Sequence, residues 1–359
     1  MKPKVTVLTT VYNGLPHLKD AIESTLNQTY TDFEYLIIDD ASTDDSVECI
    51  LGYKDSRIRF IQNKKNQGVS STFNKALSTI NTPYVVRLDQ DDVSLPNRLK
   101  EQIGYLEKYP NISVVSSWEI IINSKGEKIR NARGSLNNYG EFIGKVLLGL
   151  SPIWHPSLAF RKKDMEALGG FKEGYKMAED FEVTSNFAIS RFNAAIVPDF
   201  HLLVRLHSAS SSAKDYEGQS ICMRKIHNET INKFISSKNS KCLSALMRLE
   251  KDPCGRRYDR IHMLDLACDL NQLVLNVNDK QNLTNNELKS LKKIFYKRMG
   301  LGVYYAKLLS RIPIFLYYPI FFSLSPLLIP QIRITFSKIY YKIHELRYIF
   351  RLFNGLIRK

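Results

Sequence analysis

Short runs of apolar and β-branched residues alternate with longer segments of helical periodicity over residues 1–120. The runs predict strands at Val5–Thr9, Tyr35–Ile38, Ile58–Gln62, Tyr84–Leu88 and Ser113–Ser117. The periodic segments predict helices that begin near Pro16, Ser42, Val69 and Pro96. Such alternation is typical of an α/β fold, so we expect a Rossmann-like, mostly parallel sheet with helices on both faces.

The pattern becomes looser between residues 120 and 215. It predicts helices at Lys163–Leu168 and Asp180–Ser190, and strands at Ala194–Val197 and Leu202–Leu206. Beyond residue 216 only helical patterns remain. We therefore expect a catalytic domain over 1–215, a helical region over 216–300, and a basic, apolar helical segment over 301–359.

The segment Ile312–Ile332 carries no charge and reaches the length of a membrane span. It also contains prolines, each of which would remove a helix hydrogen bond in lipid, at positions Pro313, Pro319, Pro326 and Pro330. A broken segment lying in the membrane interface is therefore the favoured interpretation, with a packed soluble hairpin and a true span as alternatives.

The formal net charge of +15 implies an anionic neighbour, because self-repulsion of this size is otherwise unfavourable. The C-terminal residues 311–359 combine many Lys and Arg residues with apolar and aromatic ones, which favours an anionic membrane surface over nucleic acid. The N-terminus lacks a secretory signal pattern, and the five cysteines lack CxxC spacing. We expect a cytoplasmic protein, peripheral on the cytoplasmic face of the membrane.

Three carboxylates, Asp89, Asp91 and Asp92, directly follow the expected strand Tyr84–Leu88. Ligands bind at the carboxyl ends of parallel strands, and carboxylates packed this closely repel one another unless a cation joins them. Hard oxygen ligands suit Mn²⁺ or Mg²⁺, which keep positions open for phosphate oxygens. A solvated acidic turn that caps the next helix is the alternative.

A second acidic pair, Glu179 and Asp180, stands at the start of an expected helix. The helix N-terminus stabilises the carboxylate anion, which suits a general base, although a simple capping role is the alternative. His207 follows the last expected strand and precedes a serine-rich stretch. It is a candidate metal ligand or diphosphate contact, with a structural role as the alternative.

An ordered series of motifs resembles family 2 of the inverting glycosyltransferases, which has the GT-A fold. The resemblance covers residues 1 to about 212. Each motif is weak alone, and their order and spacing carry the resemblance. The motifs are Val5–Asn13, Ile37–Asp44, Asn66–Gly68, Leu88–Asp92, His155–Ser157, Gly169–Phe171 and Ala178–Glu182.

The resemblance implies roles for the residues that follow the first strands. Thr10, Tyr12 and Asp40 match positions that hold the donor's base and ribose, and Asp39 would be a structural or ribose contact. Donor contacts are also implied for the loop and helix that come next, at Asn66, Gly68 and Asn74. Many members carry an arginine just before that asparagine, where this chain has Phe73 preceded by Thr72. One phosphate contact of the family is therefore in doubt.

The resemblance also implies the catalytic assignments. Asp91 matches the metal-binding aspartate, with Asp89 and Asp92 supporting the metal, the diphosphate or the sugar, and His207 resembles a histidine near the diphosphate. Asp180 matches the catalytic base, with Glu179 beside it.

We therefore expect metal-assisted, inverting transfer of a sugar from a nucleoside diphosphate donor, with UDP as the expected nucleotide, to a hydroxyl of a lipid-linked or surface-polysaccharide acceptor. A catalytically idle nucleotide-sugar-binding or membrane assembly protein is the alternative.

Overall fold

The computed structural model describes residues 2–175, 178–207, 216–235 and 272–295. All of these belong to one compact unit. The segment 301–359, with the stretch Ile312–Ile332, lies outside the described residues. Within the described ranges, no helix combines the length and the apolar character needed to cross a membrane.

The N-terminal half is the expected α/β arrangement. Strand β1 (Val5–Val11) pairs in parallel with both β2 (Phe33–Asp39) and β4 (Tyr84–Arg87), and β2 pairs in parallel with β3 (Ile58–Gln62). The connecting helices are α1 (Leu18–Leu26), α2 (Ser46–Gly52) and α3 (Val69–Thr79). The α/β fold expected from the alternating pattern is confirmed.

The second half turns the sheet into a mixed one, in the order β3-β2-β1-β4-β8-β6-β9-β5. Between β4 and β6 (Ile112–Asn123) lies the short β8 (Ala159–Arg161), antiparallel to both. Strand β9 (Asn193–Leu206) runs parallel to β6. Two further strands add at the edges, β5 (Val93–Ser94) on β9 and β7 (Lys128–Ala132) on β6. The carboxyl end of β9 therefore comes close to the turn that follows β4.

The prediction of two separate strands at Ala194–Val197 and Leu202–Leu206 is wrong, because β9 is continuous over both. Pro198, which lacks an N–H group for the ladder, favoured a break. The structure accommodates it with an irregular register, in which Ser117 pairs with Val197 but the next residue, Trp118, pairs with Phe200. Such an irregularity keeps one strand continuous while it skips residues that cannot pair.

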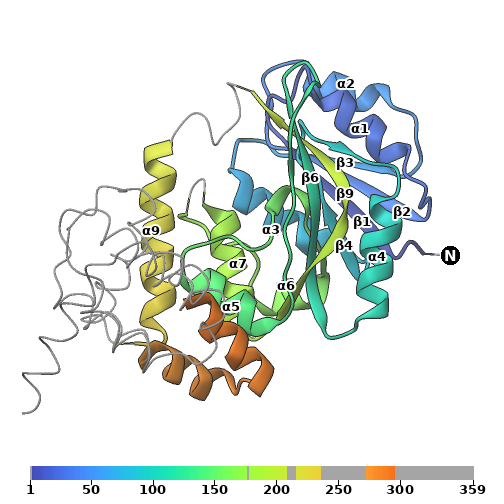
Figure 1. The fold of residues 1–359 in the computed structure, drawn as a ribbon. Helices are drawn as coiled ribbons and strands as arrows, with labels where there is room; N and C mark the ends of the chain where they lie inside the picture. Colours follow the sequence, from blue (N-terminus) through green and yellow to red (C-terminus); the bar gives the residue numbers. More distant parts are fainter. Residues whose placement is uncertain (1, 176–177, 208–215, 236–271, 296–359) are drawn as a thin grey trace, which may run out of the picture. The chain divides into compact units, whose positions relative to one another are not determined.

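Alternate residues of the sheet pack on opposite layers of helices. Val5, Val7 and Val11 of β1 belong to a core that also includes apolar residues of α1, α2 and α4 (Arg98–Lys108). The intervening Leu8 is buried as well, on the side of α3, which contacts β1 and β2. Figure 1 shows α4 on one side of the sheet and α3 and α7 (Glu179–Ile189) on the other.

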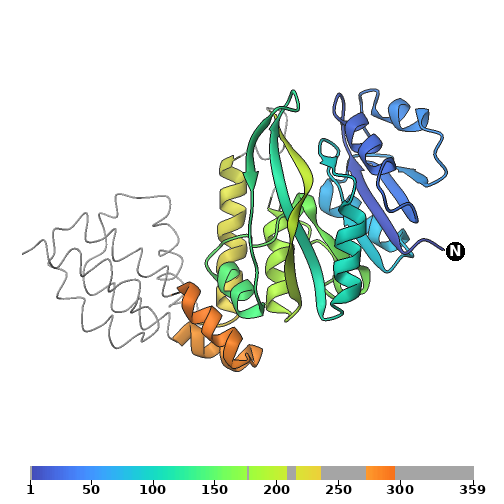
Figure 2. The same ribbon diagram turned by 45° about the vertical axis from the view of Figure 1, so that its right-hand side comes forward.

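The remaining helices pack beside the sheet. They are α5 (Tyr139–Leu147), α6 (Lys162–Ala167), α7 (Glu179–Ile189), the short 3₁₀ turn His155–Ser157 and α9 (Tyr216–Asn232), which contacts α5 and α7 (Figure 2). Two helical stretches, 272–281 and 285–295, follow. The guanidinium of Arg191 binds both carboxylate oxygens of Glu287, at 3.0 and 2.9 Å. The helical residues 272–295 are thus tied to the end of α7.

Candidate functional site

A pocket of about 540 Å³ opens where β1, β2 and β4 end. The carboxyl ends of parallel strands meet there, which is where an α/β sheet binds ligands. All but two of the site residues expected from the sequence line it. They are Thr10, Tyr12, Asp40, Asn66, Gly68, Asp89, Asp91, Asp92, Glu179, Asp180 and His207.

Asp40 shapes the loop that leads into α3. Its carboxylate accepts hydrogen bonds from the side chain of Asn63 at 2.7 Å and from the backbone N–H groups of Gln67 and Gly68, at 3.0 and 2.8 Å. Gly68 has a φ of +83°, a conformation that side-chain-bearing residues rarely adopt. Asp40 therefore holds this loop open at the pocket wall.

The two remaining expected residues, Asp39 and Asn74, are occupied elsewhere. Asp39 accepts from the backbone N–H of Ser42 at 3.1 Å and from Gln62 at 3.3 Å. Asn74 donates to the carbonyl oxygen of Phe171 at 2.7 Å and accepts from the N–H of the same residue at 2.8 Å. These contacts fix loops behind the pocket.

The acidic turn after β4 (Asp89–Asp92) is held in place by three side-chain contacts. Asp89 forms an ion pair of 2.6 Å with Arg87. Asp91 Oδ2 lies 2.7 Å from His207 Nε2. Asp92 is 2% exposed and accepts from the backbone N–H of Arg205 at 2.9 Å. Burial raises the pKa of Asp92 well above its ordinary value, and the neighbouring carboxylates raise it further.

Arginines complete the site, and the sequence reasoning missed them. Arg205 donates from Nε to the carbonyl oxygen of Asp91 at 2.9 Å and pairs with Asp20 at 2.6 Å. Arg87 lines the pocket, and its buried Nη1 has no hydrogen-bond partner among the described residues. An arginine inside an otherwise apolar strand was the available signal for both.

The donor set of the pocket fits a divalent ion. Asp91 offers a carboxylate and His207 an imidazole, and they meet at the pocket wall. Mn²⁺ or Mg²⁺ typically takes one or two carboxylates from the protein and fills its other positions with water and substrate phosphates. A complete cage of protein ligands is therefore not required.

Glu179 and Asp180 lie in the first turn of α7 and face the same pocket. Burial raises the pKa of Asp180, while a hydrogen bond from the N–H of Phe181 and the charge of Arg87 oppose that shift. Burial also raises the pKa of Glu179. A carboxylate of raised basicity at the end of a pocket can accept a proton from a bound hydroxyl.

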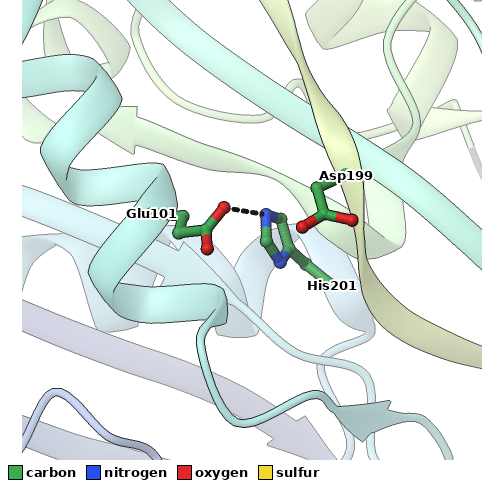
Figure 3. Close-up of side chains that lie close together, drawn as sticks. All are labelled: Glu101, Asp199 and His201. Atoms are coloured by element: carbon green, nitrogen blue, oxygen red, sulfur yellow. Dashed lines mark ion pairs between the residues drawn. The ribbon is translucent and has the colours of Figure 1, made fainter.

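Another group of potential metal ligands lies outside this pocket. Glu101 of α4 and His201 of β9 form an ion pair of 3.3 Å, with Asp199 beside them (Figure 3). Their ligand atoms all lie within 4.8 Å of one another. None of the three lines the pocket. We interpret this group as a polar link between α4 and β9.

Comparison with known proteins gives consistent findings. The family model described as "Glycosyl transferase family 2" matches residues 6–169. An uncharacterized glycosyltransferase of Methanocaldococcus jannaschii is 31% identical over 209 residues, which cover 57% of this chain and 71% of that protein. An uncharacterized glycosyltransferase of Haemophilus influenzae is 28% identical, over 65% of this chain and 75% of its own length.

A similar architecture is found among solved structures. That of S. aureus TarS 1-349 in complex with UDP-GlcNAc superposes with a TM-score of 0.56 and 16% identity, over 83% of this chain and 88% of that one. At this identity the likeness concerns the fold.

Proposed function

This chain belongs to glycosyl transferase family 2, and on that premise we propose that it transfers a sugar from a nucleoside diphosphate donor to an acceptor hydroxyl with inversion at the anomeric carbon. The observation that carries the proposal is the pocket itself. Its lining includes a carboxylate-imidazole pair, Asp91 and His207, and a separate acidic pair, Glu179 and Asp180, which supports the proposal. Inverting transfer needs these two functions and no protein nucleophile.

The donor would lie along the ends of β1, β2 and β4. Tyr12 is 45% exposed beside the pocket and would stack on the base, with Thr10, Asp40, Asn66 and Gly68 around the nucleoside. UDP is the expected nucleotide. Asp39 and Asn74 would act by supporting their loops, since both side chains are already engaged.

Asp91 and His207 would hold Mn²⁺ or Mg²⁺, and Asp89 would lie near the diphosphate or the sugar. Asp92 would keep the turn in place through Arg205. When bound there, such an ion would supply positive charge to offset the charge that develops on the departing diphosphate. Arg87, which also lines the pocket, would add a second positive charge.

Asp180 would act as the general base, with Glu179 orienting the acceptor. The acceptor oxygen attacks the anomeric carbon and gives its proton to the Asp180 carboxylate. The bond from the anomeric carbon to the diphosphate oxygen breaks, and the diphosphate departs with the electron pair. Attack opposite to the leaving group inverts the anomeric centre.

We further propose that residues 1–215 form the catalytic part, followed by a helical region at 216–300 and a membrane-associating segment at 301–359. The basic and aromatic composition of the last segment supports peripheral attachment to the cytoplasmic face of an anionic membrane. Attachment there would bring the site to a lipid-linked or surface-polysaccharide acceptor.

The test is a screen of the purified chain with Mn²⁺ against UDP-, GDP-, CDP- and dTDP-sugars, with release of the nucleotide as the readout. We expect slow hydrolysis of one donor class, because water can replace the missing acceptor. The Asp91→Ala variant should lose this hydrolysis. Equal background rates with all donors, in the wild type and in the variant, would refute the proposal.

A further inference from the structure

Gln90 stands between two carboxylates of the acidic turn and binds the backbone of Tyr12, which is 78 residues earlier in the chain. The N–H of Tyr12 donates to Gln90 Oε1 at 2.8 Å, and Gln90 Nε2 donates to the carbonyl oxygen of Tyr12 at 3.2 Å. One side-chain amide thus satisfies both polar backbone groups of a single residue. Such a pair fixes both the position and the orientation of that peptide segment.

Gly14 shows how closely the loop and the amide are packed. A Cβ atom at Gly14 would lie 3.2 Å from Gln90 Oε1, and 3.3 Å from Val11 Cγ1. Either distance is tighter than an ordinary van der Waals contact. A side chain at this position would therefore press against Gln90, and the loop approaches the amide this closely because the residue is a glycine.

The other side of the same loop is fixed on the segment after β2. Asn13, with a φ of +50°, donates from its N–H to Ser42 Oγ at 2.9 Å, and its side chain accepts from the N–H of Thr43 at 2.8 Å. Gly14 donates to Ser46 Oγ at 2.9 Å. Gln90 joins this loop directly to the acidic turn, and farther along the chain His17 contacts the ring of His207, with 5.2 Å between the ring centroids.

The part of the pocket where Asp91 and His207 would hold the metal ion is called the metal end here. Both neighbours of Gln90 in the chain form side-chain contacts there. Asp89 pairs with Arg87, and Asp91 contacts His207. We infer that Gln90 couples the two ends of the pocket, because the position of the acidic turn sets the position of Tyr12. This inference rests on the proposed function. Filling the metal end should favour the arrangement that binds the nucleoside, and by reciprocity the nucleoside should tighten metal binding by the same factor.

The test uses a ligand that lacks phosphate, so that it reaches the metal end only through the protein. Mn²⁺ binding to the full chain is titrated by the electron paramagnetic resonance signal of the free ion. Titrations are made with and without the nucleoside whose diphosphate binds best among uridine, guanosine, cytidine and thymidine. In the wild type, we expect the nucleoside to tighten Mn²⁺ binding about fivefold or more.

Two variants of Gln90 then test whether it acts by positioning Tyr12 or by a general effect on the stability of the protein. Gln90→Met keeps the length of the side chain and removes both hydrogen bonds, so the ratio of the two Mn²⁺ affinities should fall to about one. Gln90→Glu keeps the acceptor for the N–H of Tyr12 and should retain part of the ratio. If Gln90→Met does not fold, the ratio of the two Mn²⁺ affinities in Gln90→Glu serves as the test, and a full ratio in that variant overturns the coupling. Gln272→Met makes the same change at an exposed helical position away from the pocket lining and should keep the full ratio.

The outcomes distinguish this inference from the function on which it rests. A wild-type ratio of one, or a full ratio in Gln90→Met, overturns the coupling while Mn²⁺-dependent binding of the diphosphate leaves the proposed function intact. Failure of every nucleoside diphosphate to bind with Mn²⁺ refutes the proposed function and this inference together.

Discussion

The carboxyl group of Asp180 combines a raised pKa with a place in the pocket wall, which are the two properties that a general base needs. Asp180→Asn keeps the shape of the side chain and removes its basicity. We expect kcat to fall by about 10² or more, with the donor dissociation constant nearly unchanged. Steady-state kinetics and calorimetry with the nucleoside diphosphate measure the two quantities.

The raised pKa of Asp180 also predicts the pH profile. The base must be ionised, so the rate should fall as the pH drops through a pKa higher than that of an ordinary aspartate. Asp180→Asn should lose this acid limb. A variant that transfers sugar at the wild-type rate would assign the role to another residue, with Glu179 next to it as the first candidate.

Glu119 of β6 is 5% exposed, and burial raises its pKa to about 7, while Ser157 and Arg98 oppose the shift. The folded protein therefore holds this proton more tightly than the unfolded chain. The free energy of unfolding should decrease as the pH rises from about 4.5 to about 7, by up to about 3 kcal/mol from this group.

Glu119→Gln should remove this part of the pH dependence, because the amide does not ionise. The measurement is urea denaturation in EDTA at pH 5 and pH 8, for the wild type and the variant. We expect the variant to gain stability relative to the wild type as the pH increases. A constant difference between the two proteins at both pH values would contradict the assignment.

Some pocket residues could be predicted from their local position in the sequence: Asp40 and Asp91 follow strands, and Asp180 stands at the start of a helix. Arg87 and Arg205 stand out in the sequence only as arginines within apolar runs, and their contacts could not be predicted, because these depend on which segments lie side by side. Asn74 matches a donor-binding position in the sequence, and its side chain binds the backbone of Phe171. The partner lies 97 residues away, so no local pattern could indicate it.

At the scale of elements, Asn74 joins α3 to the Gly169–Phe171 turn after α6. Asn74→Ala removes both hydrogen bonds to the backbone of Phe171. The half-buried N–H and carbonyl groups of Phe171 then lack these partners. We expect the free energy of unfolding to fall by about 1–3 kcal/mol, with little direct change in donor affinity. Thermal denaturation and nucleotide titration of the variant test this. Unchanged stability with a large loss of affinity would restore Asn74 as a donor contact.

Gly170 provides an independent check of the same contact. Its φ is +75°, and a Cβ atom there would overlap the side-chain oxygen of Asn74. Gly170→Ala should therefore destabilise the protein through both strain and this overlap. In the Asn74→Ala background the overlap is absent, so the double variant should be less destabilised than the sum of the single variants.

The strands show what the pattern of residues can and cannot predict. The parallel strands up to β4 were predicted because their apolar runs are separated by complete helices. Strands β5 and β8 were not predicted, because two or three residues are too short to show a period, and β7 was not predicted because its residues are mostly polar and form no apolar run. The sequence pattern predicts a break near Pro198, whereas β9 is continuous there because its register with β6 skips the proline.

At the scale of the whole molecule, the C-terminal segment should govern attachment to membranes. A basic segment gains about 1 kcal/mol per Lys or Arg near an anionic surface, so the attachment should be salt-sensitive, with an additional salt-resistant part from apolar insertion. We expect the full chain to sediment with anionic liposomes, to be released partly by high salt and fully by detergent.

Truncation after about residue 300 should abolish this sedimentation and preserve donor hydrolysis, because the described pocket uses no residue beyond Gln219. Neutral phosphatidylcholine vesicles serve as the control. If the full chain also stays in the supernatant with anionic vesicles, the segment does not attach to membranes, and the proposal of a lipid-linked acceptor loses its support.

In the proposed function, the acidic turn and His207 bind the donor's diphosphate through a divalent ion. Calorimetric titration of the nucleoside diphosphate, with Mn²⁺ and then with EDTA, tests it most directly in the wild type and in Asp91→Ala. We expect firm binding only with Mn²⁺ in the wild type, and weak binding under both conditions in the variant. Equal affinity with Mn²⁺ and with EDTA in the wild type would contradict it.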